Sequence, residues 1–466
     1  MNPFDYLLQY FPYSPTPQQV VLFQKLQDFI AAEDAHRHAF LLKGFAGTGK
    51  TTVIQTLSRT LSKLKYRIVL LAPTGRAAKL VAKHTRRKAY TIHRQIYKQV
   101  QHPYSGAVTF KLRKNYHTRT VFIVDEASMV SHLAEGGREP MLTDLIRYVF
   151  TDTTNKLVIV GDTAQLPPVG QTLSAMLHAD VLRYAYDLQV EAYELTDVVR
   201  QGAQSGILAN ATALRDALKQ TAPIIALNVQ KYPDTFSMSP EKLTDGLSYA
   251  YLKYDIADTL LLCPSNREAV RYNQLIRSSI LHRPDTVAEG DLLMVARNNY
   301  HVLPKPNRLS FLANGEFVEV VEVQDIEPMY DLRFATLLLR LPDYPRQAAF
   351  VGKVILDTLD SASPALPEPD NHRLYEAVAQ EYTHIELNSR RLKAIRKDPY
   401  LNALQVKYAY ALTGHKAQGG QWKAVFIDPG YLSQPPPTAD TLRWLYTALT
   451  RATDELFLIN ASPEWF

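Results

Sequence analysis

A glycine-rich stretch that follows a short apolar run constrains the fold of this chain more than any other part of its sequence. The run, Ala39–Leu42, predicts a buried strand. Gly44, Gly49, Lys50 and Thr51 then match the pattern G-x-x-x-x-G-K-S/T, which forms a phosphate-binding loop between a strand and a helix. An ordinary glycine turn is the alternative, but the position directly after a strand favours the phosphate-binding loop.

The residue types in this stretch suit a bound triphosphate. Small residues let consecutive backbone N–H groups turn inward around phosphate oxygens, and glycine tolerates the positive φ angles that this requires. The Lys50 side chain can reach the β- and γ-phosphates, and the Thr51 hydroxyl can bind Mg²⁺. Residues 52–65 predict a helix whose N-terminal dipole faces the anion. The expected nucleotide-binding residues of the loop are Gly44, Gly47, Thr48, Gly49, Lys50, Thr51 and Thr52.

Composition predicts an intracellular, cytoplasmic protein. The chain has 466 residues, enough for about three compact units. No apolar run approaches the roughly 20 residues that a membrane-spanning helix needs, so we expect no membrane association. The first residues lack the basic-then-apolar order of a signal peptide. The single cysteine, Cys263, excludes an internal disulfide framework, a cysteine-ligated zinc site and a Cys₄ iron–sulfur cluster.

Charge is distributed unevenly along the chain. The net charge is +6, yet residues 35–124 contain no Asp or Glu and 19 of the 52 Lys and Arg residues. The remainder of the chain is therefore acidic overall. Such a segregated basic region predicts a polyanionic partner. A set of solvated basic faces on an otherwise acidic protein is the alternative.

Two further apolar runs end in polar residues. Thr120–Val124 predicts a buried strand that leads into Asp125 and Glu126, and Leu157–Val160 predicts a strand that precedes Gln165. The carboxyl ends of parallel strands meet at one edge of a sheet. The carboxylate pair could there hold the water shell of a metal ion and activate an attacking water. Gln165 would lie near the γ-phosphate if the two strands are neighbours.

The order of the predicted elements indicates an α/β protein with two insertions. Strands and helices alternate up to about residue 200, but residues 94–119 interrupt them with two alternating runs that predict a β-hairpin, Ile96–Val100 and Val108–Leu112. Short alternating runs from Glu289 to Asp360 predict a small antiparallel barrel. His372–Lys397 predicts a charged amphipathic helix, and the α/β order resumes at Leu404.

Taken in order, these motifs resemble the series found in superfamily 1 helicases, and most closely the RecD/Dda-like 5′→3′ branch. The resemblance runs from Thr16 to Leu458. Its most specific parts are Gly161–Val169, Tyr410–Gly419 and Leu445–Ala452. The resemblance implies an α/β fold with two RecA-like P-loop domains, a β-hairpin (pin) insertion in the first and a small SH3-like β-barrel insertion in the second.

The expected domains follow from this resemblance. Residues 1–200 form the N-terminal RecA-like ATPase domain, with the hairpin insertion at 94–119. Residues 201–288 and 405–466 form the second RecA-like domain. Residues 289–404 form the inserted barrel domain with its helix.

The resemblance also implies roles at the nucleotide site. Lys50 and Thr51 serve ATP and Mg²⁺, Asp125 completes the metal site and Glu126 is the general base. Gln165 is implied to sense the γ-phosphate.

Three further residues gain a role from the resemblance alone. Arg200 and Arg451 become arginine fingers, and a guanidinium suits that role because it is permanently charged and forks around transition-state oxygens. Without this context both arginines would be read as surface salt-bridge partners. The resemblance implies that Gln19 contacts adenine, whereas the local pattern Thr16-Pro17-Gln18-Gln19 favours a first-turn helix residue.

The resemblance implies contacts with single-stranded DNA and with junctions between single and double strands. The implied residues are Pro73, Thr74, His93, His415 and, more weakly, Lys416. A core histidine is the alternative for His415. The aromatic residues that stack on bases and the protein partners stay open.

The expected function is therefore an ATP-dependent DNA helicase that moves 5′→3′ on single-stranded DNA and unwinds duplex with the pin hairpin. A translocase that remodels protein–DNA complexes without processive unwinding is the nearest alternative. A DNA-binding clamp with a decayed ATPase is a second, although every expected catalytic residue is present. A P-loop kinase or GTPase is a third, and RNA in place of DNA stays possible.

Overall fold

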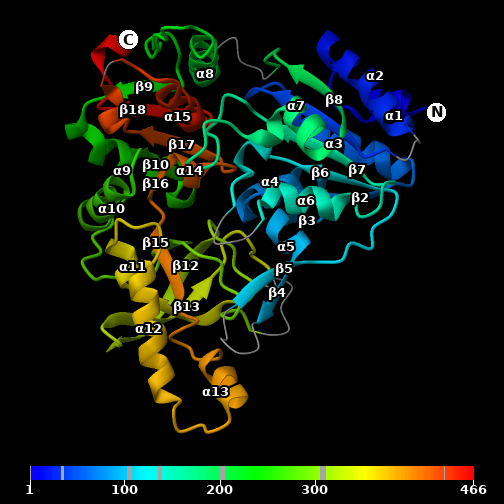
Figure 1. Cartoon of the computed structure of the whole chain (residues 1–466). Helices are drawn as coiled ribbons and strands as arrows, with labels where there is room; N and C mark the ends of the chain where they lie inside the picture. The colour runs from blue at the N-terminus through cyan, green and yellow to red at the C-terminus, as the bar shows by residue number, and fades with distance from the viewer. Residues whose placement is uncertain are drawn as a thin grey trace.

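The computed structural model describes residues 2–32, 36–101, 108–134, 139–199, 205–304, 311–434 and 436–466. Two α/β lobes lie side by side, and a barrel adjoins them (Figure 1). We call the lobe that carries the phosphate-binding loop lobe 1 and the other lobe 2. Within the described ranges, no helix combines the length and apolar character that crossing a membrane requires.

Lobe 1 is built on a parallel six-stranded sheet with the order β3-β2-β6-β7-β1-β8. Its strands are β1 (His38–Gly44), β2 (Arg67–Ala72), β3 (Ala89–Thr91), β6 (Thr120–Val124), β7 (Lys156–Gly161) and β8 (Gln189–Leu195). Its helices are α1 (Pro3–Tyr10), α2 (Pro17–Ala31), α3 (Lys50–Lys63), α4 (Gly75–Thr85), α5 (Ile92–Ile96), α6 (Met141–Val149) and α7 (Ala179–Tyr186).

The central strand β1 is continuously apolar over Ala39–Leu42 because it faces a core on both sides of the sheet. Along β1, Phe40 and Leu42 pack into the core that includes α2 and α3, whereas Ala39 and Leu41 pack into the core that includes α6. All four side chains are at most 1% exposed. Burial on both faces explains why this run does not alternate with polar residues.

Three strands bring the predicted chemical residues to one edge of this sheet. β7 lies between β6 and β1 and pairs with both in parallel. The carboxyl ends of the three strands lead into the phosphate-binding loop, the Asp125–Glu126 pair and the segment that begins at Gly161. Ligands of open α/β sheets bind at this edge. The neighbouring strands on which the prediction for Gln165 depended are therefore present.

The predicted hairpin is also present. β4 (Tyr97–Gln101) and β5 (Val108–Leu112) pair antiparallel as a separate two-stranded ribbon. Ile96, which the sequence placed in the first strand, is instead the last residue of α5. The connection between the two strands lies outside the described residues.

Lobe 2 has a parallel five-stranded sheet with the order β16-β10-β17-β18-β9. Its strands are β9 (Thr235–Met238), β10 (Thr259–Cys263), β16 (Ala411–Thr413), β17 (Trp422–Ile427) and β18 (Ala452–Ile459). Its helices are α8 (Gly206–Ala217), α9 (Leu243–Tyr254), α10 (Asn266–Leu275), α14 (Gly414–Ala417) and α15 (Ala439–Leu449). No phosphate-binding loop follows β10, because Ser265 there caps α10 by accepting a hydrogen bond from the Glu268 N–H at 3.2 Å.

Five strands close the barrel: β11 (Leu292–Val295), β12 (Phe317–Met329), β13 (Leu332–Arg340), β14 (Phe350–Ile355) and β15 (Leu404–Tyr408). Neighbours pair antiparallel except β14 and β15, which are parallel. The sequence placed residues 405–408 in lobe 2, whereas the structure places them in the barrel. In β15, apolar side chains alternate with Gln405 and Lys407, and this two-faced pattern is typical of a barrel strand.

The predicted helix at 372–397 is two helices. α12 (Glu368–Glu381) and α13 (Asn388–Ile395) follow the short α11 (Asp357–Asp360) in the connection between β14 and β15. The Tyr382 hydroxyl donates to Oδ2 of Asp398 at 3.0 Å, and this bond joins the end of α12 to the segment after α13. The chain therefore turns back where the sequence predicted continuous helix.

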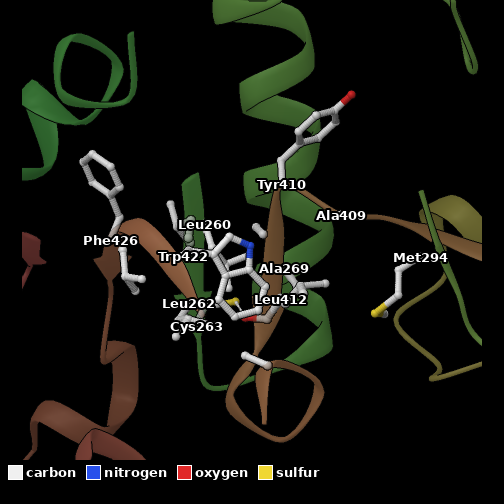
Figure 2. Packing of buried hydrophobic residues seen from close by; sticks show 14 of the residues in the cluster. Leu260, Leu262, Cys263, Ala269, Met294, Ala409, Tyr410, Leu412, Trp422 and Phe426 are labelled. Atoms are coloured by element: carbon white, nitrogen blue, oxygen red, sulfur yellow. Dashed lines mark hydrogen bonds between the residues drawn. The ribbon is translucent and has the colours of Figure 1, made fainter. Parts of the chain in front are cut away.

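The hydrophobic cluster of lobe 2 and the barrel extends to the facing edge of lobe 1, whose sheet has two further clusters of its own. Phe45, Ala164 and Leu166 of lobe 1 belong to the same buried cluster as the strands of lobe 2 and of the barrel. Figure 2 shows part of this cluster around Trp422 and Tyr410. The predicted fold class, two RecA-like domains with a hairpin insertion in the first and an SH3-like barrel insertion in the second, is confirmed.

A buried arginine from lobe 1 joins all three parts. The guanidinium of Arg76, in the first turn of α4, lies 3.9 Å from the ring centroid of Trp422 in lobe 2 and 4.5 Å from that of Phe317 in the barrel. Burial lowers the pKa of Arg76 to about 9. One turn later, Nζ of Lys79 lies 3.9 Å from the ring centroid of Tyr344. Cation–π contacts of this kind hold α4 against its neighbours.

Candidate nucleotide site and strand-binding surface

The phosphate-binding loop joins β1 to α3 at the carboxyl edge of the sheet in lobe 1. Gly47 and Gly49 have φ angles of 81° and 89°, which residues with a Cβ rarely adopt. A Cβ at Gly49 would also lie 3.0 Å from Nε2 of Gln19. Gly49 is the N-cap of α3 and supplies no side-chain cap. The first N–H groups of the helix are thus left for an anion.

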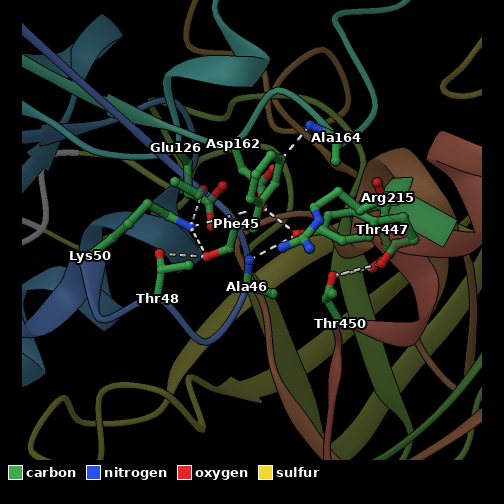
Figure 3. Close-up of polar contacts among 12 residues, drawn as sticks. Phe45, Ala46, Thr48, Lys50, Glu126, Asp162, Ala164, Arg215, Thr447 and Thr450 are labelled. Carbon is green, nitrogen blue, oxygen red and sulfur yellow. Dashed lines mark hydrogen bonds and ion pairs between the residues drawn. The ribbon is translucent and has the colours of Figure 1, made fainter. Parts of the chain in front are cut away.

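The ammonium group of Lys50 lies inside this loop. It donates hydrogen bonds to the carbonyl oxygens of Gly44 and Phe45 at 2.6 and 2.8 Å. It also lies 3.8 Å from Oδ2 of Asp162, as Figure 3 shows. The Lys50 side chain is 16% exposed. A mostly buried cation held by loop carbonyls is positioned to exchange them for phosphate oxygens.

Gln19 is the first-turn helix residue that the local pattern favoured, and its side chain also reaches the phosphate-binding loop. Its Oε1 accepts a hydrogen bond from the Thr16 N–H at 3.0 Å, and its N–H donates to the Thr16 hydroxyl, which makes a capping box at the start of α2. Its Nε2 donates to the carbonyl oxygen of Thr48 in the loop at 3.4 Å. Gln19 is 1% exposed. The structure therefore places it against the loop, and the adenine contact stays a prediction.

The acidic pair follows β6 beside the loop. Glu126 has a φ angle of 53°, and its N–H donates to Oδ1 of Asp125 at 2.9 Å. Burial and the charge of Glu126 raise the pKa of Asp125, while the Glu126 N–H and Lys50 act in the opposite direction. Both side chains are partly exposed.

The donor set fits a magnesium ion that is held mainly through phosphates. Thr51 and Asp125 are the protein ligands that the sequence predicted, and Mg²⁺ commonly takes one or two protein oxygens together with phosphate oxygens and waters. Within the parts of the chain that the structure describes, no three His, Cys, Asp or Glu side chains converge as a metal cluster. The site therefore suits a metal that arrives with its nucleotide.

Gln165 lies in the segment after β7 with an unused acceptor. The residue is 6% exposed, and its Oε1 has no hydrogen-bond partner among the described residues. A buried polar atom without a partner is costly and is usually explained by a ligand or water. The next residue, Leu166, accepts from Nε2 of Gln418 at 2.8 Å through its carbonyl oxygen. This segment is thus held by lobe 2 while Gln165 keeps a free acceptor.

Tyr446 of α15 reaches from lobe 2 into the nucleotide site. Its hydroxyl donates to Oδ2 of Asp162 at 2.7 Å and accepts from the N–H of Ala46 in the loop at 2.8 Å. Beside it, the Thr447 hydroxyl accepts from the Leu166 N–H at 2.9 Å. Tyr446 is 1% exposed. The sequence analysis gave Tyr446 no role, and its position inside the motif 445–452 was the only signal available.

The two predicted arginine fingers differ in what the structure describes. The guanidinium of Arg451 donates to the carbonyl oxygens of Thr447 and Gly420 at 3.0 and 3.2 Å and to the Thr450 hydroxyl at 3.1 Å. These partners all belong to lobe 2. Arg200 lies outside the described residues. Both roles stay predictions.

A third arginine that the sequence analysis missed lies over the loop. The guanidinium of Arg215, from α8, is 4.7 Å from the ring centroid of Phe45. Its Nε donates to Oδ1 of Asp216 at 3.2 Å. No motif marks Arg215 in the sequence, because only the packing of α8 against α15 brings it to the loop.

The predicted strand-binding residues of lobe 1 lie at the end of β2 and in α5. Pro73 follows β2, and Thr74 is the N-cap of α4, where its hydroxyl accepts from the Ala77 N–H at 3.2 Å. His93 lies in an aromatic group, with ring centroids 4.5 Å from Phe110 of the hairpin and 6.5 Å from Tyr300 of the barrel region. Because β2 pairs with β3 through Ala72 and Thr91, Thr74 and His93 both follow the same edge of the sheet.

In lobe 2, His415 and Lys416 follow β16. Burial lowers the pKa of His415, while a hydrogen bond with the backbone of Pro167 in lobe 1 acts in the opposite direction. Burial lowers the pKa of Lys416 to about 8. His415 is thus a lobe contact, in line with the alternative of a core histidine, and its contact with a strand stays a prediction.

A second buried lysine, which the sequence analysis missed, shares a pocket with Lys416. Lys407 of β15 lines this pocket together with Asn266, Thr413 and Ser361. Burial and the charge of Lys416 lower the pKa of Lys407 to about 8, while Asp360 raises it. No acidic residue is among the residues that line the pocket. Two partly desolvated ammonium groups in one pocket favour an anion as their ligand.

Comparisons with known proteins agree with this arrangement. A family model described as an AAA domain matches residues 26–230, and a model described as a UvrD-like helicase C-terminal domain matches residues 408–459. The chain is 23% identical over 518 residues to the uncharacterized protein R530 of Acanthamoeba polyphaga mimivirus. That alignment covers 96% of this chain and 99% of the viral protein.

Two named relatives are helicases. The chain is 29% identical over 429 residues to the ATP-dependent RecD2 DNA helicase of Deinococcus radiodurans. That alignment covers 91% of this chain but only 47% of the Deinococcus protein. It is 23% identical over 295 residues to the ATP-dependent DNA helicase dda of Enterobacteria phage T4. That alignment covers 62% of this chain and 64% of the phage protein. The chain thus spans about half the length of RecD2.

Proposed function

Because the chain belongs to the RecD/Dda-like group of superfamily 1 helicases, whose members hydrolyse ATP, we propose that it couples hydrolysis to movement along single-stranded DNA and unwinds duplex DNA. The observation that carries the proposal is the meeting of both lobes at the phosphate-binding loop. Lys50 and Asp162 come from lobe 1, and the Tyr446 hydroxyl from lobe 2 bonds to Asp162 and to the loop. A motor needs such a shared site because only there can hydrolysis change how the lobes sit.

The residues of lobe 1 would hold the nucleotide and its metal. The loop amides and Lys50 bind phosphate oxygens, and Thr51 with Asp125 holds Mg²⁺. When bound, Mg²⁺ neutralises charge that develops on the phosphates during hydrolysis. Glu126 accepts a proton from the attacking water, and Gln165 uses its free acceptor to orient that water. These assignments are proposals for the residues of this chain.

Lobe closure supplies the remaining charge. Arg451 now donates to lobe 2 carbonyls, so its role in hydrolysis requires its guanidinium to leave Thr447 and Gly420 and to turn toward the phosphates. An arginine finger of this kind contributes about 10³–10⁵ in rate in comparable phosphoryl transfers. Arg451 then contacts the nucleotide in one state and its own lobe in the other. Such a difference between states is what a nucleotide cycle needs to move two lobes.

The strand would run across the carboxyl edges of both sheets. Thr74 lies at this edge in lobe 1, and Lys416 lies at the corresponding edge in lobe 2, where it shares a pocket with Lys407 of the barrel. If the two lobes release phosphates at different stages of the cycle, closure and opening move the strand in one direction. The hairpin of β4 and β5 would separate the strands ahead of the motor. The 5′→3′ direction is proposed from family resemblance.

A pair of assays tests this proposal. ATPase rates measured with no nucleic acid, with single-stranded DNA and with RNA of equal length should show stimulation by DNA. Strand displacement is then measured on duplexes with a 5′ or a 3′ single-stranded tail, and the 5′-tailed duplex should be unwound. Stimulation without displacement would identify a translocase instead. Absence of stimulation by any nucleic acid would overturn the motor proposal altogether.

A further inference from the structure

The free edge of the sheet in lobe 1 forms a groove that none of the sites above uses. β2 pairs with β3 only over its last three residues, so in the described chain its first three residues have no strand beside them on this side. The groove is lined by Ile68 and Val69 of this unpaired part and by Leu70, which pairs with Ala89. Its other walls come from residues just before and within β3, from α5 and from the segment that follows β5. The groove therefore lies at the base of the hairpin.

The walls of this groove carry four basic side chains. Arg87 and Lys88 precede β3, Arg94 belongs to α5 and Arg113 follows β5. Arg87, Lys88 and Arg113 are exposed. No Asp or Glu is among the lining residues. We call this feature the basic groove, and its charge makes a polyanion the favoured ligand.

Hydrogen bonds fix one wall of the basic groove to the hairpin. The Arg113 N–H donates to the carbonyl oxygen of Ile96 at 2.6 Å, and Nε of Arg113 donates to that of Tyr97 at 2.6 Å. Nε2 of Gln95 donates to the Tyr148 hydroxyl at 3.0 Å. These bonds join this wall to β4 of the hairpin and, through Tyr148, to α6 of lobe 1. A ligand bound in the groove would therefore lie at a fixed distance from the hairpin.

An aromatic ring lies among these cations. The guanidinium of Arg94 is 5.0 Å from the ring centroid of Tyr90, which lines the groove and is partly exposed. Cations that follow the phosphates, combined with an aromatic face for the bases, are the features that bind single-stranded nucleic acid. The chemistry is independent of base sequence because every base has a stacking face.

The basic groove is separate from the expected path of the strand between the lobes. Thr74 lies at the carboxyl end of β2, whereas the groove lies along its amino-terminal half. His93 faces Phe110 and Tyr300, toward the barrel. All lining residues of the groove belong to lobe 1. A strand in this groove would therefore pass on the side of the hairpin that does not lead into the cleft.

We propose that the basic groove binds the second strand of a forked DNA, the strand that the hairpin turns away from the lobes. This inference rests on the proposed motor function. Protection of the free sheet edge is the alternative, because charged side chains at an open edge prevent pairing with other chains. The two roles differ in whether the groove touches nucleic acid.

Site-specific crosslinking identifies the strand that lies in the groove. The single cysteine, Cys263, is buried, so Arg113→Cys creates one accessible thiol for a photoreactive maleimide. The DNA is a fork whose two strands carry different dyes, and the track strand is the one whose single-stranded arm stimulates the ATPase. The crosslinked product should carry the dye of the second strand. Lys219→Cys, at an exposed position after α8, serves as the control.

Binding measurements test the charge of the groove. The variant Arg87→Gln/Lys88→Gln/Arg113→Gln is compared with Lys219→Gln/Lys231→Gln/Lys242→Gln, which removes the same charge from exposed sites in lobe 2. Dissociation constants are measured over a salt series for a two-armed fork and for a fork without the second arm. On the two-armed fork the groove variant should bind about tenfold more weakly, with a log–log salt slope smaller by up to about 2, which corresponds to three phosphates at about 0.7 each. Its loss on the one-armed fork should not exceed that of the control.

Each other outcome overturns the inference. Equal losses on both forks, or crosslinks to the track strand, would make the groove part of the track. Binding equal to the control on both forks, with aggregation of the groove variant, would assign its charges to edge protection. Failure of the motor proposal is visible separately, because the unmodified protein would then lack ATPase stimulation by DNA.

Discussion

The carboxyl edges of the two sheets offer two different solutions for binding an anion. In lobe 1 the edge presents backbone N–H groups of a glycine loop together with Lys50, and acidic residues follow β6, two strands away in the sheet. In lobe 2 the same edge has no such loop, and two partly buried lysines, Lys407 and Lys416, line a pocket there. Backbone amides carry no charge that titrates, whereas ammonium groups do.

This difference has a functional consequence. An amide cradle with an adjacent carboxylate pair suits a triphosphate that must be bound with its metal and cleaved. A pair of lysines without a carboxylate among the lining residues suits a phosphodiester that is bound and released without chemistry. We therefore expect substitutions at the edge of lobe 1 to affect hydrolysis and substitutions at the edge of lobe 2 to affect strand binding.

The substitution Lys50→Ala gives the sharpest test of this division. It removes the ammonium group that neutralises phosphate charge, so ATPase activity should fall by more than about 10³-fold, to background. Affinity for single-stranded DNA should stay close to that of the unmodified protein. The measurements are steady-state hydrolysis and fluorescence anisotropy. Lys25→Ala, at an exposed ion pair with Glu191, is the control. Normal turnover in the Lys50 variant would remove the loop from the catalytic site.

The substitution Glu126→Gln should come next in effect. The amide cannot accept a proton, and general bases of this type contribute about 10²–10⁴ in rate. We expect tight binding of ATP with hydrolysis slowed by this factor, measured in a single-turnover experiment with trapped nucleotide. The substitution keeps size and hydrogen bonding, so ATP binding checks the fold. Full retention of kcat would assign the base role to another residue.

The substitution Tyr446→Phe tests whether the two edges are coupled. It removes the hydroxyl that joins the Ala46 N–H to Asp162 but keeps the ring in its place. Hydrogen bonds that involve a charged group contribute about 1.5–3 kcal/mol, so we expect at least about a tenfold loss in kcat/KM for ATP in the presence of DNA. The ratio of rates with and without DNA should also fall, because lobe 2 no longer holds the loop.

A matched control exists for this substitution. The Tyr251 hydroxyl is buried in lobe 2 and has no hydrogen-bond partner among the described residues. Tyr251→Phe therefore removes the same atom from the same lobe without breaking a bond. If both variants behave alike, the contact between Tyr446 and the loop does not couple the lobes.

The two sites also differ in how well the amino-acid sequence predicts them. The site in lobe 1 was predictable because its residues are close together in the chain, at fixed spacing between a strand and a helix. The strand order of lobe 1 then placed the ends of β6 and β7, which lead to Asp125 and Gln165, at the same edge of the sheet as the loop. Conversely, the pocket in lobe 2 joins Lys416 to Lys407 of a barrel strand, and no spacing rule connects them. Only tertiary structure brings such residues together.

Side-chain contacts between the lobes could not be predicted for the same reason. Tyr446 and Arg215 read as ordinary helix residues, since their partners are determined by how α8 and α15 pack against lobe 1. The helix at 372–397 was predicted too long because its charge pattern continues through the turn that Tyr382 and Asp398 hold. The barrel itself was recognisable from alternating runs, but its closing strand lies beyond the helices and was assigned to lobe 2.

Removal of both lysines should have a smaller effect than the substitutions above. For Lys407→Met/Lys416→Met we expect affinity for single-stranded DNA to fall about fivefold at moderate salt, with a salt slope smaller by about 0.7–1.4, as for one or two phosphates. Methionine retains length and apolar packing. The control is Lys231→Met/Lys242→Met at exposed sites of the same lobe. An unchanged salt slope would show that the pocket holds no phosphate.

The smallest expected effect is a change in strand affinity with pH, which should come from the lysines and not from the amide cradle of lobe 1. Burial lowers the pKa of Lys416 to about 8, and burial together with the charge of Lys416 lowers that of Lys407 to about 8 against the effect of Asp360. A lysine with a pKa of about 8 is about 90% charged at pH 7 and about 10% charged at pH 9. Only the charged form attracts a phosphate, so strand affinity should fall about threefold as the pH rises between these values. The pKa of the neighbouring His415 is lowered by burial, so this group is already uncharged across the range.

The substitution Lys416→Arg tests whether this pH dependence of strand affinity comes from the lysine. Lys416→Arg keeps a cation whose pKa is far above the range, so the decline in affinity between pH 7 and 9 should become shallower. The amide cradle of lobe 1 does not titrate. The pH dependence of ATP affinity should therefore be the same in the unmodified protein and in Lys416→Arg. A strand-affinity profile that declines equally with lysine and with arginine would show that the lysines of lobe 2 do not bear on binding, and the two edges would then differ in chemistry but not in role.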